Sequence, residues 1–384
     1  MERRKLEEHI RALATIEEND SPLISCYLTA NQGGIVCREQ LDARFRVLRK
    51  CLPARSVAEF EEAQRSIETF LKAGLSQRTR GVALFARAGE RPLWRVLEFE
   101  APLPTWIAVG SSPNIYHLME LKDNYDRYAI LLMTETSARI IGVNLGSVTA
   151  QLWRSRPELR QRVGREWSKD HYQDHRRERT RQFVNDQVRS LERLLLETGY
   201  EHLILAGNPR VTATVRKALP KNIAEKVIDC VPASRTDDVS DIVASTLETF
   251  LAHEEMESQA VADRLITQLQ THGLAVAGAA ASIEAVKSGQ ADILVIVQGY
   301  DPGRAWECQG CGRFSLALPR PGACPNCRSR RVREFDLRGE LARIAELRRV
   351  AIEVVEHSDA LMSLGGVGCL LRYSGPANYV YTAA

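Results

Sequence analysis

The sequence predicts a multidomain α/β protein, and three observations point to this class. Its 384 residues are enough for two or three domains of ~100–200 residues each. Apolar residues make up 44% and charged residues 26% of the chain, as in ordinary globular proteins. Short apolar stretches typical of strands alternate with stretches of helical periodicity. No apolar run approaches the ~20 residues that cross a bilayer, so we expect no membrane contact.

The first predicted domain covers residues 1–124. An amphipathic helix over residues 1–17 ends at the turn-forming run Asn19-Asp20-Ser21-Pro22. The charged N-terminus of this helix is unlike a signal peptide, so we expect a cytoplasmic protein. The other predicted elements are a buried strand at 23–28, helices at 38–51 and 56–73, strands at 81–87, 93–99 and 105–109, and a helix at 115–121.

The second predicted domain covers residues 125–260. It opens with a buried strand at 128–133, which we expect to pair with 138–143 across a turn at 135–137. Because strands and helices then alternate, the pattern favours a mainly parallel sheet with helices on its faces. The later elements are a strand at 148–153, a polar loop, a basic helix at 175–198, strands at 202–207 and 227–231, and helices at 211–219 and 237–260.

The third predicted domain covers residues 261–384 and carries an insertion at 305–334. Three glycines, Gly365, Gly366 and Gly368, surround the start of its last buried strand, which indicates that the backbone passes close to a neighbour there. The predicted helices are 259–271, 282–289, 336–350 and 359–364, and the predicted strands are 273–277, 291–297, 351–355 and 365–373.

The insertion holds two Cys-x-x-Cys pairs, the sharpest chemical signal in the chain. Cys308, Cys311, Cys324 and Cys327 offer four sulfur ligands, the set that holds tetrahedral zinc. Because cysteine fills all four positions and none is left for water, we expect one structural Zn²⁺ per chain and no catalytic metal. Two unrelated thiol pairs, or two disulfides, are the alternatives.

Five further cysteines are scattered in apolar surroundings. Their odd number and their contexts predict buried free thiols in a reducing cytosol. They are Cys26, Cys37, Cys51, Cys230 and Cys369.

A basic segment lies between residues 154 and 181, although the net charge of the whole chain is only +3. Arginine dominates the segment, and two aromatic residues are available to stack on unpaired bases. Such a surface fits the phosphates of RNA and would bind with steep salt dependence. A solvated helix face is the alternative. The predicted RNA-binding residues are Arg154, Arg156, Arg160, Arg162, Arg165, Trp167, Lys169, Tyr172, Arg176, Arg177, Arg179 and Arg181.

Three features of the third domain occur in an order known from one family. They are the run Ala285-Val-Lys-Ser-Gly-Gln-Ala-Asp-Ile-Leu-Val-Ile296, the inserted cysteine ribbon, and Leu364-Gly-Gly-Val-Gly-Cys-Leu-Leu-Arg-Tyr373. In these features the chain resembles the archaeal and eukaryotic class-1 peptide-chain release factors and their paralogue Pelota. The resemblance implies a C-terminal α/β/α sandwich of the ribosomal-protein L7Ae type with an inserted zinc ribbon.

The resemblance extends more weakly toward the N-terminus. The second domain is similar to the middle domain of the family, and the first domain to its N-terminal domain. A three-domain, release-factor-like architecture that imitates tRNA is therefore implied. In this family the N-terminal domain enters the decoding site, and the middle domain reaches the peptidyl-transferase centre.

The loop of the second domain departs from the family pattern. Release factors carry Gly-Gly-Gln there, whose glycines let the backbone approach the peptidyl ester, but this chain contains no such tripeptide. Gln173 could be a displaced stand-in, but it has no flanking glycine to bring the backbone as close to an ester. His171 and His175 lie four residues apart, as a base or metal pair or, in the reading we favour, as solvated polar residues. We therefore expect no catalytic residue and no hydrolysis of peptidyl-tRNA.

The decoding end departs from the family too. An Asn-Ile-Lys-Ser loop joins the two N-domain helices of release factors, but here the junction is only Leu52-Pro-Ala-Arg-Ser56. The Tyr-x-Cys-x-x-x-Phe pattern of the family is also missing from the sequence. We therefore expect no stop-codon reading.

Bacterial members of the family that lack Gly-Gly-Gln include the hibernation factor Balon, and this chain is similar to that branch. The resemblance implies a non-enzymatic factor that occupies the ribosomal A site, contacts rRNA and acts in hibernation or rescue. We also expect a monomer that contacts a translational GTPase such as elongation factor Tu. The alternatives are a peptidyl-tRNA hydrolase using Gln173 with His171 or His175, and an RNA-binding protein unrelated to ribosomes.

Overall fold

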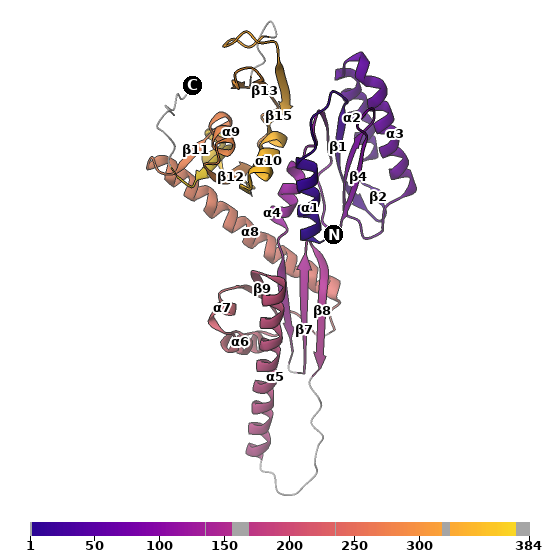
Figure 1. The fold of residues 1–384 in the computed structure, drawn as a ribbon. Coiled ribbons are helices and arrows are strands. Elements are labelled where there is room, and N and C mark those ends of the chain that lie inside the picture. Colours follow the sequence, from indigo (N-terminus) through magenta and orange to yellow (C-terminus); the bar gives the residue numbers. More distant parts are fainter. Residues whose placement is uncertain (1, 135, 156–168, 235, 317–322, 374–384) are drawn as a thin grey trace. The chain divides into compact units, whose positions relative to one another are not determined.

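The chain forms two compact units in a computed structural model that describes residues 2–134, 136–155, 169–234, 236–316 and 323–373 (Figure 1). Side chains are described except at 154, 155 and 169–177. The first unit combines residues 3–124 with 255–384, and the second comprises residues 125–254. None of the helices in these ranges combines the length and the apolar character needed to cross a membrane.

A single helix, α8 (Val239–Gln270), contains the division between the units. The prediction of two helices, 237–260 and 259–271, is wrong at this point. No glycine or proline occurs within α8 to interrupt its hydrogen bonds. Helical periodicity by itself therefore gave no signal of where one unit ends and the next begins.

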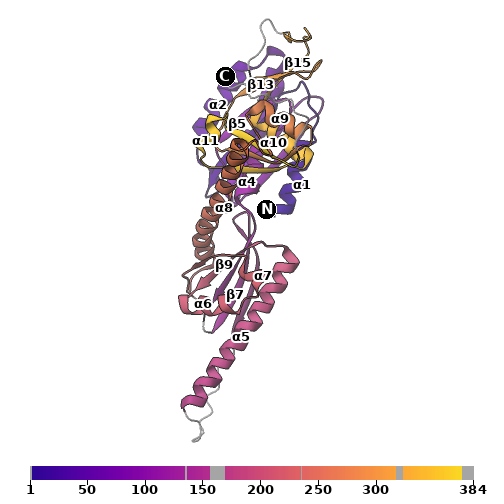
Figure 2. The same ribbon diagram turned by 90° about the vertical axis from the view of Figure 1, so that its left-hand side faces the viewer.

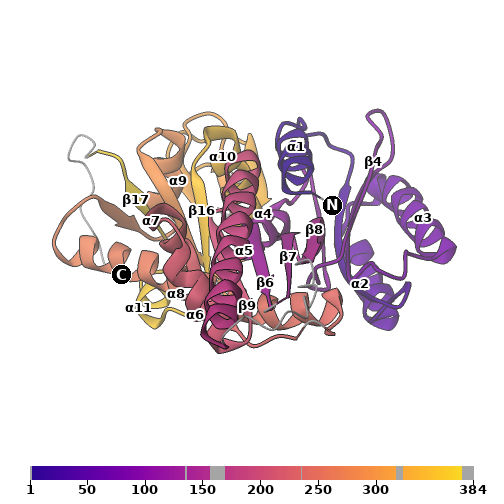
Figure 3. The same ribbon diagram turned by 90° about the horizontal axis from the view of Figure 1, so that it is seen from below.

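An antiparallel sheet forms the centre of residues 3–124. The helices α2 (Arg38–Cys51) and α3 (Val57–Ala73) pack on one of its faces, where Cys26, Phe45 and Phe60 are fully buried. Figure 3 shows both helices along the same side of the sheet. The predicted strands and helices are confirmed. The strand order is β2-β1-β3-β4 with β5 beside β1, where β1 is Leu23–Asn31, β2 Gly34–Ile35, β3 Gly81–Arg87, β4 Leu93–Phe99 and β5 Trp106–Gly110.

The segment leading into α4 (Tyr116–Asn124) binds the same sheet through buried polar groups. The hydroxyl of Tyr27 on β1 donates to the carbonyl oxygen of Asn114 at 2.6 Å. The hydroxyl oxygen of Ser25 accepts from the backbone N–H of Asn114 at 3.0 Å. Helix α1 (Arg3–Ala14) packs against α4. These helices therefore lie where they can contact the C-terminal part of the same unit.

The second unit is built on a mixed five-stranded sheet with the order β10-β9-β6-β7-β8. The predicted hairpin is confirmed, since Met133 pairs with Ala138. The prediction of a mainly parallel sheet is wrong, because β6, β7 and β8 are antiparallel and only β6, β9 and β10 are parallel. Short turns join β6 to β7 and β7 to β8. They allow only antiparallel pairing, because a parallel pair needs a longer crossover between its strands. The strands are β6 (Tyr128–Met133), β7 (Ser137–Asn144), β8 (Ser147–Ser155), β9 (His202–Gly207) and β10 (Val227–Val231).

Helices cover both faces of this sheet. Leu131 of β6 faces a cluster with Val188 of α5 (Lys169–Thr198) and Val215 of α6 (Pro209–Ala218). Its neighbour Ile130 faces the other cluster, with Phe250 of α8. Figure 2 shows α5, α6 and the short α7 (Lys221–Ala224) beside the strands. Burial on both faces explains why β6 is a continuous apolar run.

The C-terminal part of the first unit contains the sheet β11-β17-β12-β16. The predicted close approach of backbone is confirmed: Gly366 has φ 69°, and a Cβ there would lie 2.3 Å from the Tyr300 ring. A Cβ on Gly368 would lie 2.8 Å from both Leu265 and the carbonyl oxygen of Val276. The elements are β11 (Ala275–Ala277), α9 (Ala279–Lys287), β12 (Ala291–Val297), α10 (Leu337–Arg348), β16 (Ala351–Val355), α11 (Asp359–Ser363) and β17 (Val367–Leu371).

The cysteines outside the ribbon are free, as predicted, but not all are buried. Cys26 and Cys369 are buried, and burial raises the pKa of the Cys369 thiol to about 12. Cys37 and Cys230 are partly exposed. The prediction is wrong for Cys51, which is exposed because it is the last residue of α2 and lies off its buried face.

Candidate metal centre and candidate RNA-binding surfaces

The inserted ribbon is a small sheet whose strands the sequence did not reveal. Strand β13 (Arg304–Cys308) pairs antiparallel with β14 (Phe314–Ser315) and with β15 (Val332–Asp336). Each Cys-x-x-Cys pair forms a similar turn: Gly312 N–H donates to Cys308 O and Arg328 N–H donates to Cys324 O, both at 2.8 Å. Gly312 and Arg328 have positive φ angles of 71° and 59°. These two turns bring the four thiols to one point.

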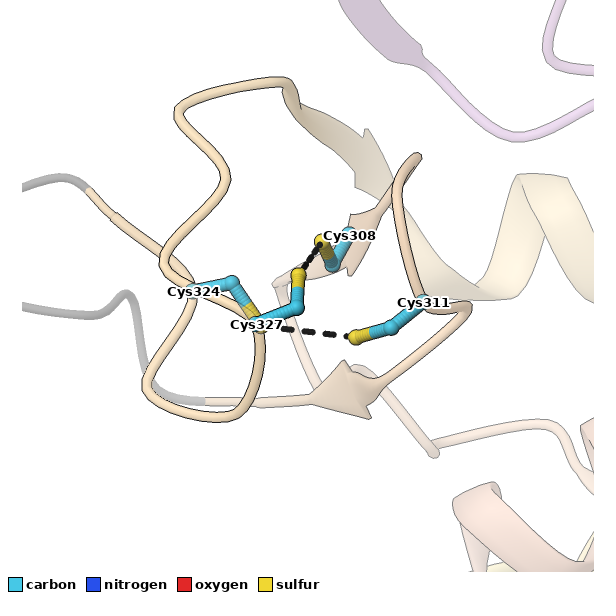
Figure 4. A group of neighbouring side chains, drawn as sticks. All are labelled: Cys308, Cys311, Cys324 and Cys327. Carbon is cyan, nitrogen blue, oxygen red and sulfur yellow. Dashed lines mark hydrogen bonds between the residues drawn. The ribbon is translucent and has the colours of Figure 1, made fainter.

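The four cysteine sulfurs fit a tetrahedral metal site (Figure 4). The Sγ atoms of Cys308 and Cys327 are 3.4 Å apart, and those of Cys311 and Cys324 are 3.6 Å apart. A zinc ion with Zn–S bonds of about 2.3 Å separates its sulfurs by about 3.8 Å. A disulfide would need an S–S distance of about 2.05 Å, so the disulfide alternative does not match this geometry.

Electrostatics within the cluster also favour a cation. A hydrogen bond from the backbone of Arg313 lowers the pKa of Cys311 to about 6, which favours the thiolate. A backbone hydrogen bond from Ser329 would by itself lower the pKa of Cys327, but the nearby Cys308 and Cys311 thiols raise it to about 12. The raised pKa of Cys327 means that the cluster does not carry four thiolates at neutral pH unless a cation lies between the sulfurs.

The ribbon has little else to hold it together. Its apolar cluster consists of Trp306, Cys308 and Cys324, with Val332 packed against them. Two of the four members are thus candidate metal ligands. A core of this size does not stabilise a fold without a metal or a covalent link. We expect the metal to hold this cluster together.

The predicted basic segment is described only in part. Arg179 and Arg181 are exposed on α5. The helix begins at Lys169, earlier than the predicted start at residue 175. The backbone of Gln173, His171 and His175 also lies in α5, but their side chains are outside the described residues. The side chains of Arg154, Lys169, Tyr172, Arg176 and Arg177, and the residues Arg156, Arg160, Arg162, Arg165 and Trp167, are outside them too.

One exposed aromatic residue beside this segment was missed. Trp153 of β8 is 46% exposed, and the guanidinium carbon of Arg139 lies 3.8 Å from its ring centroid. The two residues are cross-strand partners on β7 and β8. An exposed ring with an arginine on one face suits stacking on an unpaired base. The signal in the sequence was an aromatic residue where the strand adjoins the arginine run.

A second exposed basic surface lies on α2. Among the described residues, no acidic partner is within ion-pair distance of Arg38, Arg46 or Lys50, although Arg49 pairs with Glu61 at 2.6 Å. Arg46 and Lys50 lie four residues apart on the helix, so their charges repel each other. Asp42 also lies on this row of α2, between Arg38 and Arg46, but the row keeps a net positive charge that favours a polyanion.

The comparisons with known proteins agree with the predicted resemblance. Residues 113–251 match the model of bacterial archaeo-eukaryotic release factor family 10. This match confirms the predicted resemblance to the release-factor superfamily. The matched residues belong mostly to the second unit, although the motifs recognised in the sequence lie in the C-terminal third.

Individual relatives are distant. The chain is 26% identical to peptide chain release factor subunit 1 of Thermococcus sibiricus over 35% of its own length and 37% of that protein. For the protein of the same name from Thermococcus onnurineus the identity is 26%, over 47% and 49% of the two chains. The chain thus spans at most about half the length of these relatives. Pelota from Archaeoglobus fulgidus overlays with 12% identity and a TM-score of 0.37, covering 96% and 92% of the two chains; a score of this size supports no functional conclusion.

Proposed function

Because residues 113–251 match a bacterial family of release-factor relatives, we propose that this chain is a ribosome-binding factor. That match is the observation that carries the proposal. The exposed arginines of α5 and the basic face of α2 add surfaces that suit rRNA. Two separate basic surfaces in different units would let one chain contact more than one region of rRNA.

The proposed factor occupies the A site in hibernation or rescue, and it neither reads a stop codon nor releases a peptide. The sequence supports this, because both the Gly-Gly-Gln tripeptide and the long decoding loop are missing from it. The helices α2 and α3 are joined only by the short turn at Ala54–Ser56. We further propose a cytoplasmic monomer whose C-terminal part contacts a translational GTPase such as elongation factor Tu.

Ribosome binding is expected to be strongly salt-dependent. The protein should pellet with 70S particles at ~100 mM salt and remain in the supernatant at ~500 mM, because released counterions drive phosphate contacts. The double variant Arg179→Gln/Arg181→Gln should make the salt dependence shallower. The magnitude of the negative slope of log K against log salt should fall by roughly 1.5, since each lost phosphate contact removes about 0.7–0.9. Sedimentation over a salt series measures both effects.

A matched control removes two arginines that already have carboxylate partners. Arg78 lies 3.0 Å from Glu100, and Arg91 lies 2.7 Å from Glu17, all on the first unit. The variant Arg78→Gln/Arg91→Gln should keep the slope of the unmodified protein. Failure to pellet at the lower salt would remove the ribosome from the proposal.

No peptide release is expected from ribosomes that hold labelled peptidyl-tRNA. The loop lacks the paired glycines that let backbone approach the ester, so the protein should give no release above the buffer blank. Release that is abolished by Gln173→Ala would show that the protein is a peptidyl-tRNA hydrolase. Arg193→Ala, an exposed substitution later in α5, is the control for helix damage.

A further inference from the structure

Strand β15 leaves the ribbon and runs directly into α10 (Figure 1). Its residue Arg333 is hydrogen-bonded to the N-terminal part of the chain. Arg333 donates from Nε to the Glu18 carboxylate at 2.8 Å. Glu18 lies in the loop between α1 and β1. The same guanidinium donates from both terminal nitrogens to Glu340 of α10, at 3.0 and 2.8 Å. One side chain of the ribbon therefore joins the two sequence-distant parts of the first unit.

This arginine is well shielded from water. The Arg333 side chain is 13% exposed and that of Glu340 is 4% exposed. Burial alone would raise the pKa of Glu340, but hydrogen bonds from Arg343 and Arg333 outweigh it and leave the pKa below its ordinary value. A buried charge that loses its partner is costly, so this network resists rearrangement as long as β15 stays in place.

The end of β15 makes a second connection to the N-terminal part. The side chain of Asp336 accepts from the Asn114 amide at 2.9 Å and also caps α10 by accepting from Gly339 N–H at 2.7 Å. Arg338, two residues later, lies over the ring of Tyr116 at 4.3 Å. The start of α4 and the loop containing Glu18 are thus both attached to residues at the exit of the ribbon.

The position of β15 depends in turn on the cysteine cluster. Its first residue, Val332, pairs with Cys308 and packs in the cluster that contains Cys308 and Cys324. Arg333 pairs with Glu307, the residue before that cysteine. Because these residues have so small an apolar cluster, the register of β15 relies on the four sulfurs being held together.

We propose that the metal-bound ribbon is a latch that fastens the loop at residues 15–22 to the C-terminal part of the first unit through Arg333. With the metal bound, β15 presents Arg333 to Glu18 and Glu340 together. Without the metal, β15 loses its register, and the loop loses its attachment to the C-terminal part, keeping contacts within the N-terminal part such as that of Glu17 with Arg91 at 2.7 Å. This latch does not depend on ribosome binding, so it can be tested on the isolated full-length protein.

Hydrogen exchange on the zinc-loaded full chain tests the latch. The N–H groups of Asn19 and Ser21 are hydrogen-bonded in the closed loop, to Ser111 O and to the Asn19 side chain. Zinc removal with a chelator should speed exchange across residues 15–22 at least tenfold, together with residues 323–336, and leave β12 unchanged. Glu18→Gln should speed exchange at 15–22 by a similar factor with the zinc still bound.

The control variant removes another ion pair of the same sheet. Arg304 and Glu334 lie 3.4 Å apart with side chains 62% and 37% exposed, and among the described residues neither side chain is hydrogen-bonded or ion-paired to the N-terminal part. Arg304→Gln should leave exchange at 15–22 unchanged. The latch is refuted if the chelator opens 323–336 without affecting 15–22. It is equally refuted if Glu18→Gln, with one zinc per chain by elemental analysis, exchanges like the unmodified protein.

Discussion

Cys308→Ser is expected to abolish zinc binding and to unfold the ribbon, while the sheet of β11, β12, β16 and β17 stays folded. Cys308 is fully buried, and its Sγ is 3.4 Å from that of Cys327, so the substitution removes one of the four clustered sulfurs. Structural sites of this kind contribute ~10–16 kcal/mol of apparent binding free energy at neutral pH. The ribbon is an insertion with its own small cluster, so its loss does not remove the core of the surrounding sheet.

Elemental analysis and fluorescence measure these two effects. The unmodified protein should contain one zinc per chain, and the variant none. Trp306 is buried within the ribbon, so its emission should shift to the red in the variant while far-ultraviolet dichroism changes little. Cys51→Ser, an exposed cysteine on α2, should change neither reading. A variant that retained its zinc, or that lost all cooperative unfolding, would contradict the assignment.

Gly366→Ala is expected to lower the free energy of unfolding of the first unit by about 2–6 kcal/mol. A side chain at φ 69° costs ~1–3 kcal/mol by itself. The added Cβ would also lie 2.3 Å from the ring of Tyr300, which is 8% exposed and held by its neighbours. Forcing one extra carbon into a packed site typically adds ~1–3 kcal/mol.

Gly289→Ala separates these two contributions. Gly289 has a similar φ of 78°, but nothing lies within 4 Å of its added Cβ. Denaturant unfolding followed by tryptophan fluorescence should therefore give a clearly smaller loss for Gly289→Ala than for Gly366→Ala. Equal losses would mean that the Tyr300 ring moves aside and that backbone conformation alone requires glycine here.

Local pattern was enough to predict most of the elements. The helices at 38–51 and 57–73 and the strands at 81–87, 93–99 and 128–133 each carry a complete local signal of periodicity and turn residues. The clustering of the four candidate ligand cysteines was predictable for the same reason, because each pair is separated by only two residues. Local physics and tertiary structure agree at these positions.

The features that the sequence did not reveal depend on residues far apart. Nothing near Arg333 identifies Glu18, which lies 315 residues earlier, as its partner. Whether the sheet of the second unit is parallel or mixed depends on which strands pair with each other. The apolar run of β6 does not reveal this, because a buried strand can have the same sequence in a parallel or an antiparallel pair. Strands β13–β15 escaped prediction because each has only two to five residues, too few to show a clear alternation.

The first unit is formed from both ends of the chain, and this determines when it can fold during biosynthesis. Residues 3–124 leave the exit tunnel before residues 125–254 and must wait for residues 255–384, which at ~5–20 residues per second takes roughly ten seconds or more. During that interval the nascent α4 surface, with Tyr116 and Glu120, has no C-terminal counterpart to cover it. The segment at 125–254 forms a compact unit of its own, so we expect it to fold cotranslationally before the first unit is complete.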